Sequence, residues 1–145
     1  MQPEFMPDRL ESGTLNTPGL AGLAAAVRHV RAQTVAAIRA HELSLMTLFL
    51  DGLRNVPKVR VYGPLEAERR VGLVSLNVGS ADPAQVALAL ETRHGIITRC
   101  GLHCAPWAHE VAGTLDRGAV RLSVGPSTTE DEIRAALAAL RELAA

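Results

Sequence analysis

The sequence predicts an α+β fold in which helices cover one face of a roughly four-stranded sheet. Two observations predict it: a long helical stretch opens the patterned part of the chain, and four short apolar segments then alternate with helical ones. The 145 residues, 48% of them hydrophobic, are enough for one domain with a substantial core. Fifteen acidic residues balance fifteen basic ones, which gives no electrostatic basis for binding nucleic acid or an anionic membrane.

Residues 1–17 are expected to form an irregular lead-in segment. They are polar, contain Pro3 and Pro7, and show neither helical nor strand periodicity. They lack the apolar stretch of a secretory signal, and no apolar run in the sequence reaches the roughly 20 residues of a membrane span. Two cysteines without an export signal favour a reducing, cytoplasmic setting with free thiols.

Residues 18–56 are expected to be connecting helices. Thr17 followed by Pro18 is typical of a helix start, with a hydroxyl cap before a proline. The apolar residues that follow recur at helical spacing: Leu20, Leu23, Val27 and Val30. A second helical segment, from about Thr34 to Asn55, places these residues on or near one face: Ile38, Leu45, Leu48, Phe49 and Leu53. The pattern is compatible with two helices or with one bent helix, and Pro57 ends it.

Residues 57–145 are expected to form a small α+β domain. The predicted strands are 59–62, 71–78, 96–98 and 119–124, and the predicted helices are 82–94, 104–112 and one from Thr129 onward. Asp82-Pro83 and His94-Gly95 carry the start and stop signals of the first of these helices. Thr129 and Glu132 have the spacing of a capping box, and the last helix has this apolar face: Ile133, Leu137, Leu140 and Leu143.

The segment Arg99–His109 is the strongest candidate for a functional site. It holds both cysteines, the only tryptophan and two of the five histidines. Cys104, at the expected start of a helix and beside His103, can act as a thiolate nucleophile favoured by the helix dipole and a nearby imidazolium. The alternative is that Cys104 is an inert, buried thiol.

A metal site and a disulfide are further interpretations of this segment. Four side chains could ligate zinc: Cys100, His103, Cys104 and His109. Compact zinc sites join two separated ligand pairs, so this single crowded cluster makes zinc a minor alternative, and no metal is expected. A reducing compartment disfavours a Cys100–Cys104 disulfide.

Two arginines add to the candidate site. Arg99 ends a predicted strand beside the cysteines and is either a bidentate partner for a carboxylate or a solvated arginine. Arg121, inside an otherwise apolar strand, is expected to have a partner. Trp107 is interpreted as a core residue. The remaining histidines are interpreted as structural: His29, His41 and His94.

Three segments share their pattern with one enzyme family. Arg99 to Pro106 resembles the Arg-x-Gly-x-His-Cys-Ala motif of cysteine desulfurases, which are pyridoxal-phosphate enzymes of the class V aminotransferase family. Leu10 to Thr17 is similar to the family's Leu/Phe-Glu-x-Gly-Thr-x-Asn segment, and Val120–Ser123 is similar to a later strand. The resemblance covers essentially the whole chain. It points to the group that includes the iron–sulfur-assembly desulfurases and the selenocysteine lyases.

The resemblance implies a fold and residue roles. The expected fold is the C-terminal small domain of a fold-type I pyridoxal-phosphate-dependent transferase. Cys104 would attack the sulfur of a substrate cysteine, keep that sulfur as a persulfide and release alanine. Arg99 would bind the substrate carboxylate, with Arg121 and His103 in the same substrate site.

The resemblance also implies that the cofactor, pyridoxal phosphate, is anchored outside this chain. Thr14, with Gly13 beside it, matches a residue that reaches the cofactor phosphate across a homodimer. The family's anchoring lysine lies upstream of these residues, whereas the only lysine here is Lys58, in a predicted strand. The chain is therefore expected to be inactive without an N-terminal pyridoxal-phosphate-binding half, and to serve a sulfur-acceptor protein. The alternatives are a selenocysteine lyase, another class V lyase or aminotransferase, a stand-alone sulfur carrier and a zinc-binding module.

Overall fold

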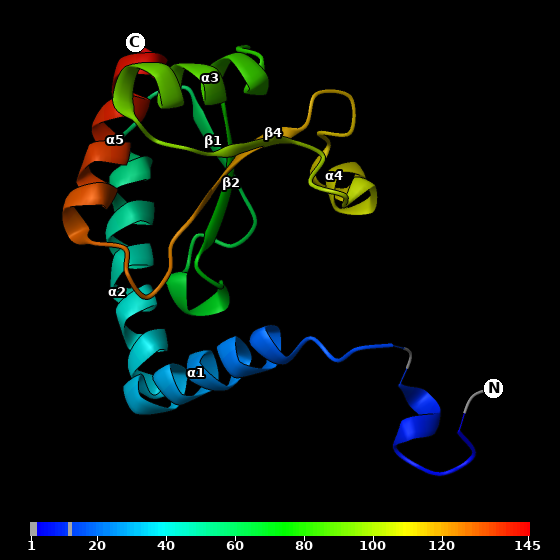
Figure 1. Ribbon diagram of the computed structural model, residues 1–145. Coiled ribbons are helices and arrows are strands. Elements are labelled where there is room, and N and C mark those ends of the chain that lie inside the picture. The colour runs from blue at the N-terminus through cyan, green and yellow to red at the C-terminus, as the bar shows by residue number, and fades with distance from the viewer. Residues whose placement is uncertain (1–2, 12) are drawn as a thin grey trace. The chain divides into compact units, whose positions relative to one another are not determined.

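The computed structural model of the protein describes residues 3–11 and 13–145. The chain divides into two compact units, Met1–Ala37 and Ile38–Ala145. The elements follow the chain in this order (Figure 1): η1 (Asp8–Leu10), α1 (Thr17–Gln33), α2 (Val35–Arg54), β1 (Val59–Tyr62), η2 (Ala67–Arg69), β2 (Leu73–Val78), α3 (Pro83–His94), β3 (Arg99–Gly101), α4 (Pro106–Ala112), β4 (Ala119–Ser123) and α5 (Glu130–Ala144). The predicted α+β fold is confirmed. Within the described residues, no helix combines the length and the apolar character that crossing a membrane requires.

The first unit contains η1 and α1. The expected lead-in, 1–17, includes the short helix η1, and its residues Met1, Gln2 and Ser12 lie outside the described part of the chain. The cap of α1 is Asn16 and not Thr17, because the Asn16 side chain accepts a hydrogen bond from the Gly19 amide at 3.0 Å. None of the residues of α1 is buried, although its apolar residues have helical spacing.

The helical stretch is two helices, broken at Thr34. This residue has a φ of 67°, in the left-handed region that a β-branched side chain rarely adopts. The Thr34 amide donates to the Val30 carbonyl and so ends α1. Its hydroxyl then accepts from the Ala37 amide at 3.2 Å, in the manner of a helix N-cap, and α2 begins.

The second unit is built on a four-stranded sheet in the order β1-β2-β4-β3, with every neighbouring pair antiparallel. Helices α2, α3 and α5 lie on one side of this sheet and α4 lies on the other (Figure 1). Strand β2 is central, and successive residues alternate between the two faces. Val74, Leu76 and Val78 are buried beneath the helices, whereas Ser75 and Asn77 occupy the opposite face.

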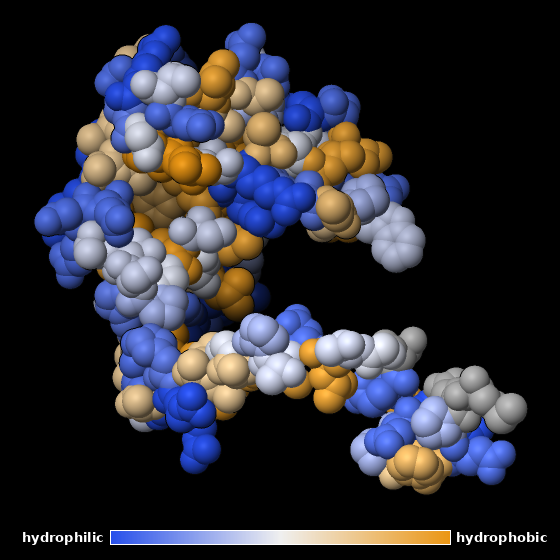
Figure 2. Space-filling model, viewed as in Figure 1, coloured by the Kyte–Doolittle hydropathy of each residue, from blue (hydrophilic) through white to orange (hydrophobic). Residues whose placement is uncertain are grey.

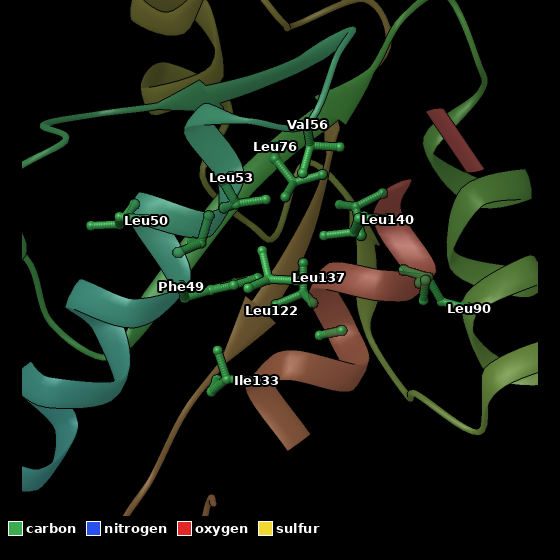
Figure 3. Close-up of a cluster of buried hydrophobic side chains, with 14 of the residues drawn as sticks. Phe49, Leu50, Leu53, Val56, Leu76, Leu90, Leu122, Ile133, Leu137 and Leu140 are labelled. Atoms are coloured by element: carbon green, nitrogen blue, oxygen red, sulfur yellow. The ribbon is translucent and has the colours of Figure 1, made fainter. Parts of the chain in front are cut away.

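The hydrophobic core fills the layer between the sheet and the three helices. Figure 3 shows Phe49 and Leu53 of α2 meeting Leu76 of β2 and Leu137 and Leu140 of α5. These five side chains are almost completely buried. The predicted apolar faces of α2 and α5 therefore do pack, with Ile133 buried as well and Leu143 partly buried. The capping box of α5 is present: Thr129 and Glu132 exchange hydrogen bonds at 2.8 and 3.3 Å.

The predicted strand at 96–98 is wrong, because β3 is Arg99–Gly101. The apolar residues before it belong to the end of α3. Gly95 adopts a left-handed conformation, its amide bonds the Glu91 carbonyl, and the Ile96 amide bonds the Leu90 carbonyl. This closure satisfies the last carbonyls of α3 and packs Ile96 against the core, so the apolar character of Ile96 serves a helix cap.

Candidate active site

The face of the sheet opposite α2, α3 and α5, here called the open face, carries a polar row across all four strands. In the strand register, Tyr62 lies opposite Ser75, Ser75 opposite Arg121, and Arg121 opposite Arg99. Residues opposite one another in antiparallel strands point to the same face. The row therefore places the two arginines from the sequence-predicted site side by side, although 22 positions separate them in the sequence (121 minus 99).

The charge of the open face is positive. The four strands contain three arginines (Arg60, Arg99 and Arg121) and no acidic residue. Among the described residues, no carboxylate forms an ion pair with any of the three. Arg60 lies over the ring of Tyr62 instead, 5.3 Å from its centroid. Such a face attracts an anionic group from outside the sheet.

The turn after β3 holds the thiol in an unusual backbone conformation. Gly101 has a φ of 100°, and His103 and Cys104 have φ values of 55° and 57°. Two consecutive non-glycine residues in the left-handed region are rare, and each costs about 1–3 kcal/mol unless its surroundings impose it. Gly118 packs directly on this turn: a Cβ atom there would lie 2.7 Å from the Gly101 Cα. Glycine at 118 thus allows the two backbones to approach each other, whereas a Cβ at Gly101 would meet open space and glycine there is favoured by its positive φ.

Cys104 is a free, exposed thiol on this turn. The nearest cation is Arg99, whose Nη2 donates to the Cys104 sulfur at 3.9 Å. The predicted helix start at Cys104 is wrong, because α4 begins two residues later, at Pro106. The alternative of an inert thiol packed in the core is also wrong, since Cys104 is exposed.

His103 lies on the same turn and is tied to β3. Its Nε2 donates to the Arg99 carbonyl at 3.1 Å, which leaves Nδ1 as the nitrogen with a free lone pair. Burial is the main cause that lowers the pKa of His103 below its ordinary value of 6.5. The bond to the Arg99 carbonyl opposes this shift, and the charges of Arg121, His109 and Arg99 lower the pKa further. The lowered pKa favours the neutral form of His103. The charged group in contact with the sulfur is Arg99.

Cys100 belongs to the face of the sheet opposite that of Arg99, the residue that contacts Cys104. Cys100 lies opposite Val120, which is buried in the core, whereas its neighbour Arg99 lies opposite Arg121 on the open face. Both cysteines are free and exposed. Across the described part of the chain, no group of three or more histidine, cysteine or acidic side chains could hold a metal ion.

A groove of about 810 Å³ borders the polar row, between the open face and α4. Six of its lining residues carry polar or aromatic groups: Arg60, Tyr62, Ser75, Trp107, His109 and Thr114. The interpretation of Trp107 as a core residue is wrong, because it is 83% exposed. Apolar side chains also reach the surface around α4 and the following loop, where Figure 2 shows orange and tan atoms and where Val111 and Leu115 are exposed.

Sequence reasoning missed one buried polar pair at the groove. His109 and Thr114 are 8% and 2% exposed, and the His109 Nδ1 shares a hydrogen bond of 2.8 Å with the Thr114 hydroxyl. The ring centroids of His109 and His103 are 5.7 Å apart. Gly113, the left-handed stop residue of α4, turns the chain so that the Thr114 amide bonds the His109 carbonyl. The sequence signal for this pair was a histidine followed five residues later by a threonine, with the helix-ending Gly113 between them.

The other histidines have partners away from the turn 101–104, which holds Cys104 and is here called the cysteine turn. His41 Nε2 donates to the Thr128 carbonyl at 2.8 Å, and His94 Nε2 lies 3.7 Å from a Glu142 carboxylate oxygen. His29 shares a hydrogen bond of 2.8 Å with Gln33. These contacts join elements of the fold or neighbouring turns of a helix, as expected for structural histidines.

The residues expected to approach a cofactor, Gly13 and Thr14, belong to the first unit and are exposed. Gly13 has a φ of 86°, a conformation that favours glycine. The only lysine, Lys58, lies before β1, and its Nζ donates to the carbonyl of Ala145 at 2.8 Å. Lys58 thus contacts the end of the chain after α5.

Known proteins resemble this chain in both sequence and structure. A cysteine desulfurase of Pectobacterium carotovorum is 36% identical over 137 residues, which are 94% of this chain and 32% of that protein. A cysteine desulfurase of Serratia proteamaculans is 39% identical over 99 residues, or 68% of this chain and 23% of the relative. The chain thus spans about a third or less of the length of these relatives.

The solved structures agree with the sequence relatives. The apo structure of a cysteine desulfurase from Thermococcus onnurineus matches with a TM-score of 0.87 and 33% identity, over 95% of this chain and 34% of that one. The Escherichia coli cysteine desulfurase CsdA, solved as an S-sulfonic acid, matches with a TM-score of 0.80 and 26% identity, over 94% of this chain and 32% of that one. This confirms the expected likeness to part of a fold-type I enzyme. Residues 3–136 match the sequence profile of the class-V aminotransferases, and the chain belongs to that family.

Proposed function

We propose that this chain is the sulfur-accepting part of a pyridoxal-phosphate-dependent cysteine desulfurase, with Cys104 as the sulfur acceptor. One observation carries the proposal: the exposed Cys104 thiol lies 3.9 Å from the Arg99 guanidinium, which is the register partner of Arg121. The likeness to cysteine desulfurases supports it. The complete protein would be a cytoplasmic homodimer that passes sulfur to an acceptor protein.

The two arginines would hold the substrate through its carboxylate. A carboxylate offers two oxygens, and an arginine fork binds them in a fixed plane. The Arg121 Nε is buried and has no hydrogen-bond partner within the described residues. An unsatisfied buried donor is costly, so an anionic group that accepts from it is favoured. This supports an α-amino acid as the substrate class.

Cys104 would then perform the transfer. Its thiolate attacks the substrate sulfur, a sulfur–sulfur bond forms, and the carbon–sulfur bond breaks with its electron pair left on the substrate β-carbon. That carbon takes up a proton and the substrate leaves as alanine, while Cys104 keeps the sulfur as a persulfide. Exposure of the thiol permits this approach. The lowered pKa of His103 favours a neutral ring, whose Nδ1 would be available as a proton acceptor.

The described residues do not build a complete pyridoxal-phosphate site. When bound, this cofactor supplies an electron sink for bond cleavage at the amino acid. Its aldehyde needs a lysine, and the amine of Lys58 is already bonded to the Ala145 carbonyl. Gly13 and Thr14 are proposed to approach the cofactor phosphate. The anchoring lysine would come from an N-terminal half, so the 145-residue chain would be inactive alone.

Turnover experiments test the proposal. The 145-residue chain is incubated with pyridoxal phosphate and L-cysteine, and alanine release is followed. We expect none, and robust turnover would contradict the need for a second half.

In the complete enzyme, Cys104→Ala should abolish persulfide formation and keep the cofactor absorbance, with Cys100→Ser as the matched control. Loss of the cofactor band in Cys104→Ala would mean that Cys104 is structural. Comparing L-cysteine with L-selenocysteine separates a desulfurase from a selenocysteine lyase.

A further inference from the structure

The cysteine turn has an unfavourable backbone conformation, so other contacts must hold it in place. His103 and Cys104 both have left-handed backbones, which is unfavourable for residues with a Cβ atom. Two backbone hydrogen bonds span the region, from Ala105 to the Leu102 carbonyl at 2.9 Å and from His109 to the Ala105 carbonyl at 3.2 Å. Neither fixes the ring of His103, the residue that precedes Cys104 in the chain.

The ring of His103 is held between two groups. On one side its Nε2 bonds the Arg99 carbonyl, and on the other it lies against the ring of His109, with 5.7 Å between centroids and 30° between ring planes. Since Arg99 also contacts the Cys104 sulfur, a change in the position of His103 would disturb both ends of the arginine–sulfur contact.

His109 is in turn fixed by Thr114. The Thr114 hydroxyl occupies the Nδ1 of His109 at 2.8 Å in either tautomer, and the Thr114 amide bonds the His109 carbonyl at 2.8 Å. Both residues are almost fully buried, so no bulk water replaces these bonds if they break. His109 lines the groove, and no described residue bonds its second ring nitrogen.

We infer that Thr114 and His109 form a positioning pair, which sets the ring of His103 and thereby keeps the Cys104 thiol beside Arg99. The importance of this thiol rests on the proposed function, whereas the positioning itself is independent of any turnover. His109 and Thr114 act through His103.

The test measures iodoacetamide alkylation of Cys104 relative to Cys100 in the 145-residue chain by peptide mass mapping at pH 7. Cys100 lies on the other face of the sheet and is an internal reference. Thr114→Val removes the hydroxyl and keeps the side-chain shape, and Thr114→Ser keeps the hydroxyl. We expect Thr114→Val to lower the ratio of the Cys104 to the Cys100 alkylation rate about two- to fivefold, because one exposed charge contact changes a rate by about this factor. Thr114→Ser should restore the ratio.

A spectroscopic readout separates positioning from a general loss of stability. The NMR titration midpoint of the His103 ring should move in Thr114→Val and return in Thr114→Ser. If Thr114→Val does not fold, His109→Phe replaces it, because phenylalanine fills the same space without a bond to Thr114. A folded Thr114→Val or His109→Phe chain with an unchanged alkylation ratio and an unchanged His103 midpoint would overturn the inference. Because no substrate is used, a failed desulfurase assay leaves this result unaffected.

Discussion

The two faces of the sheet use the same four strands for opposite purposes. Beneath α2, α3 and α5, the strand residues are Val74, Leu76, Val78, Val120 and Leu122, all buried in one apolar cluster. On the open face, the neighbouring positions carry arginines, Tyr62 and Ser75. Because strand side chains alternate, one residue step changes the role from stability to binding. Substitutions at adjacent strand positions should therefore separate folding from chemistry.

The largest expected effect on stability is on the sheet face beneath α2, α3 and α5, here called the covered face. Leu76→Ala removes a side chain that is fully buried against the helices, and we expect a loss of about 2–5 kcal/mol in the free energy of unfolding, measured by urea denaturation. The matched control, Ser75→Ala, changes the adjacent residue on the open face and should cost less than about 0.5 kcal/mol. Equal losses for the two variants would remove the distinction between the faces.

The next effect concerns the support of the cysteine turn. Gly118→Ala places a Cβ 2.7 Å from Gly101 at a φ of 74°, and we expect a loss of roughly 1–3 kcal/mol together with slower alkylation of Cys104. Gly125, which has open space around it, is the control, and Gly125→Ala should leave both measurements nearly unchanged. A Gly118→Ala chain as stable as the parent would show that the close backbone approach is unimportant.

A smaller effect is expected at the start of α5. Thr129→Ala removes the hydroxyl that accepts from the Glu132 amide at 3.3 Å, and we expect a loss of about 1 kcal/mol in thermal or urea unfolding. Since α5 lies on the covered face, the rate of Cys104 alkylation should stay the same. A change in that rate would mean that the two faces are coupled.

The smallest effect is a pH dependence on the open face. Because the pKa of His103 is lower in the folded chain than its ordinary 6.5, the unfolded chain binds more protons as the pH falls through this range. The contribution of His103 to stability is therefore present above pH 6.5 and is lost as the pH falls toward its folded pKa. His103→Gln should remove this part of the pH dependence in urea unfolding. An NMR titration midpoint of His103 above 6.5 would contradict the sign.

The sequence predicted most of the helices well, because local signals determine them. The capping box at Thr129, the break at Gly95 and the apolar face of α5 follow from spacings of a few residues. The position of β3 could not be predicted, because the apolar Ile96 completes the cap of α3. Pairing between strands decides which residues meet, so the adjacency of Arg99 and Arg121 was not readable from periodicity.

The buried pair of His109 and Thr114 could not be predicted from the sequence either. Trp107 was expected in the core, whereas His109, a polar residue on the same short helix, is the one that is buried. A histidine can be buried at low cost only when a partner satisfies its nitrogen, and Thr114 does so. That compensation depends on the turn at Gly113, which composition alone does not reveal.

The most direct measurement is the location of sulfur after a single turnover of the complete enzyme with L-cysteine. Peptide mass mapping under non-reducing conditions would compare the peptide that contains Cys104 with the same peptide in the Cys104→Ala enzyme, and with a Cys100→Ser enzyme. We predict one additional sulfur atom on Cys104 in the parent and in Cys100→Ser, and none in Cys104→Ala. Additional sulfur on Cys100, with Cys104 unmodified, would contradict the assignment of the open face as the reactive one.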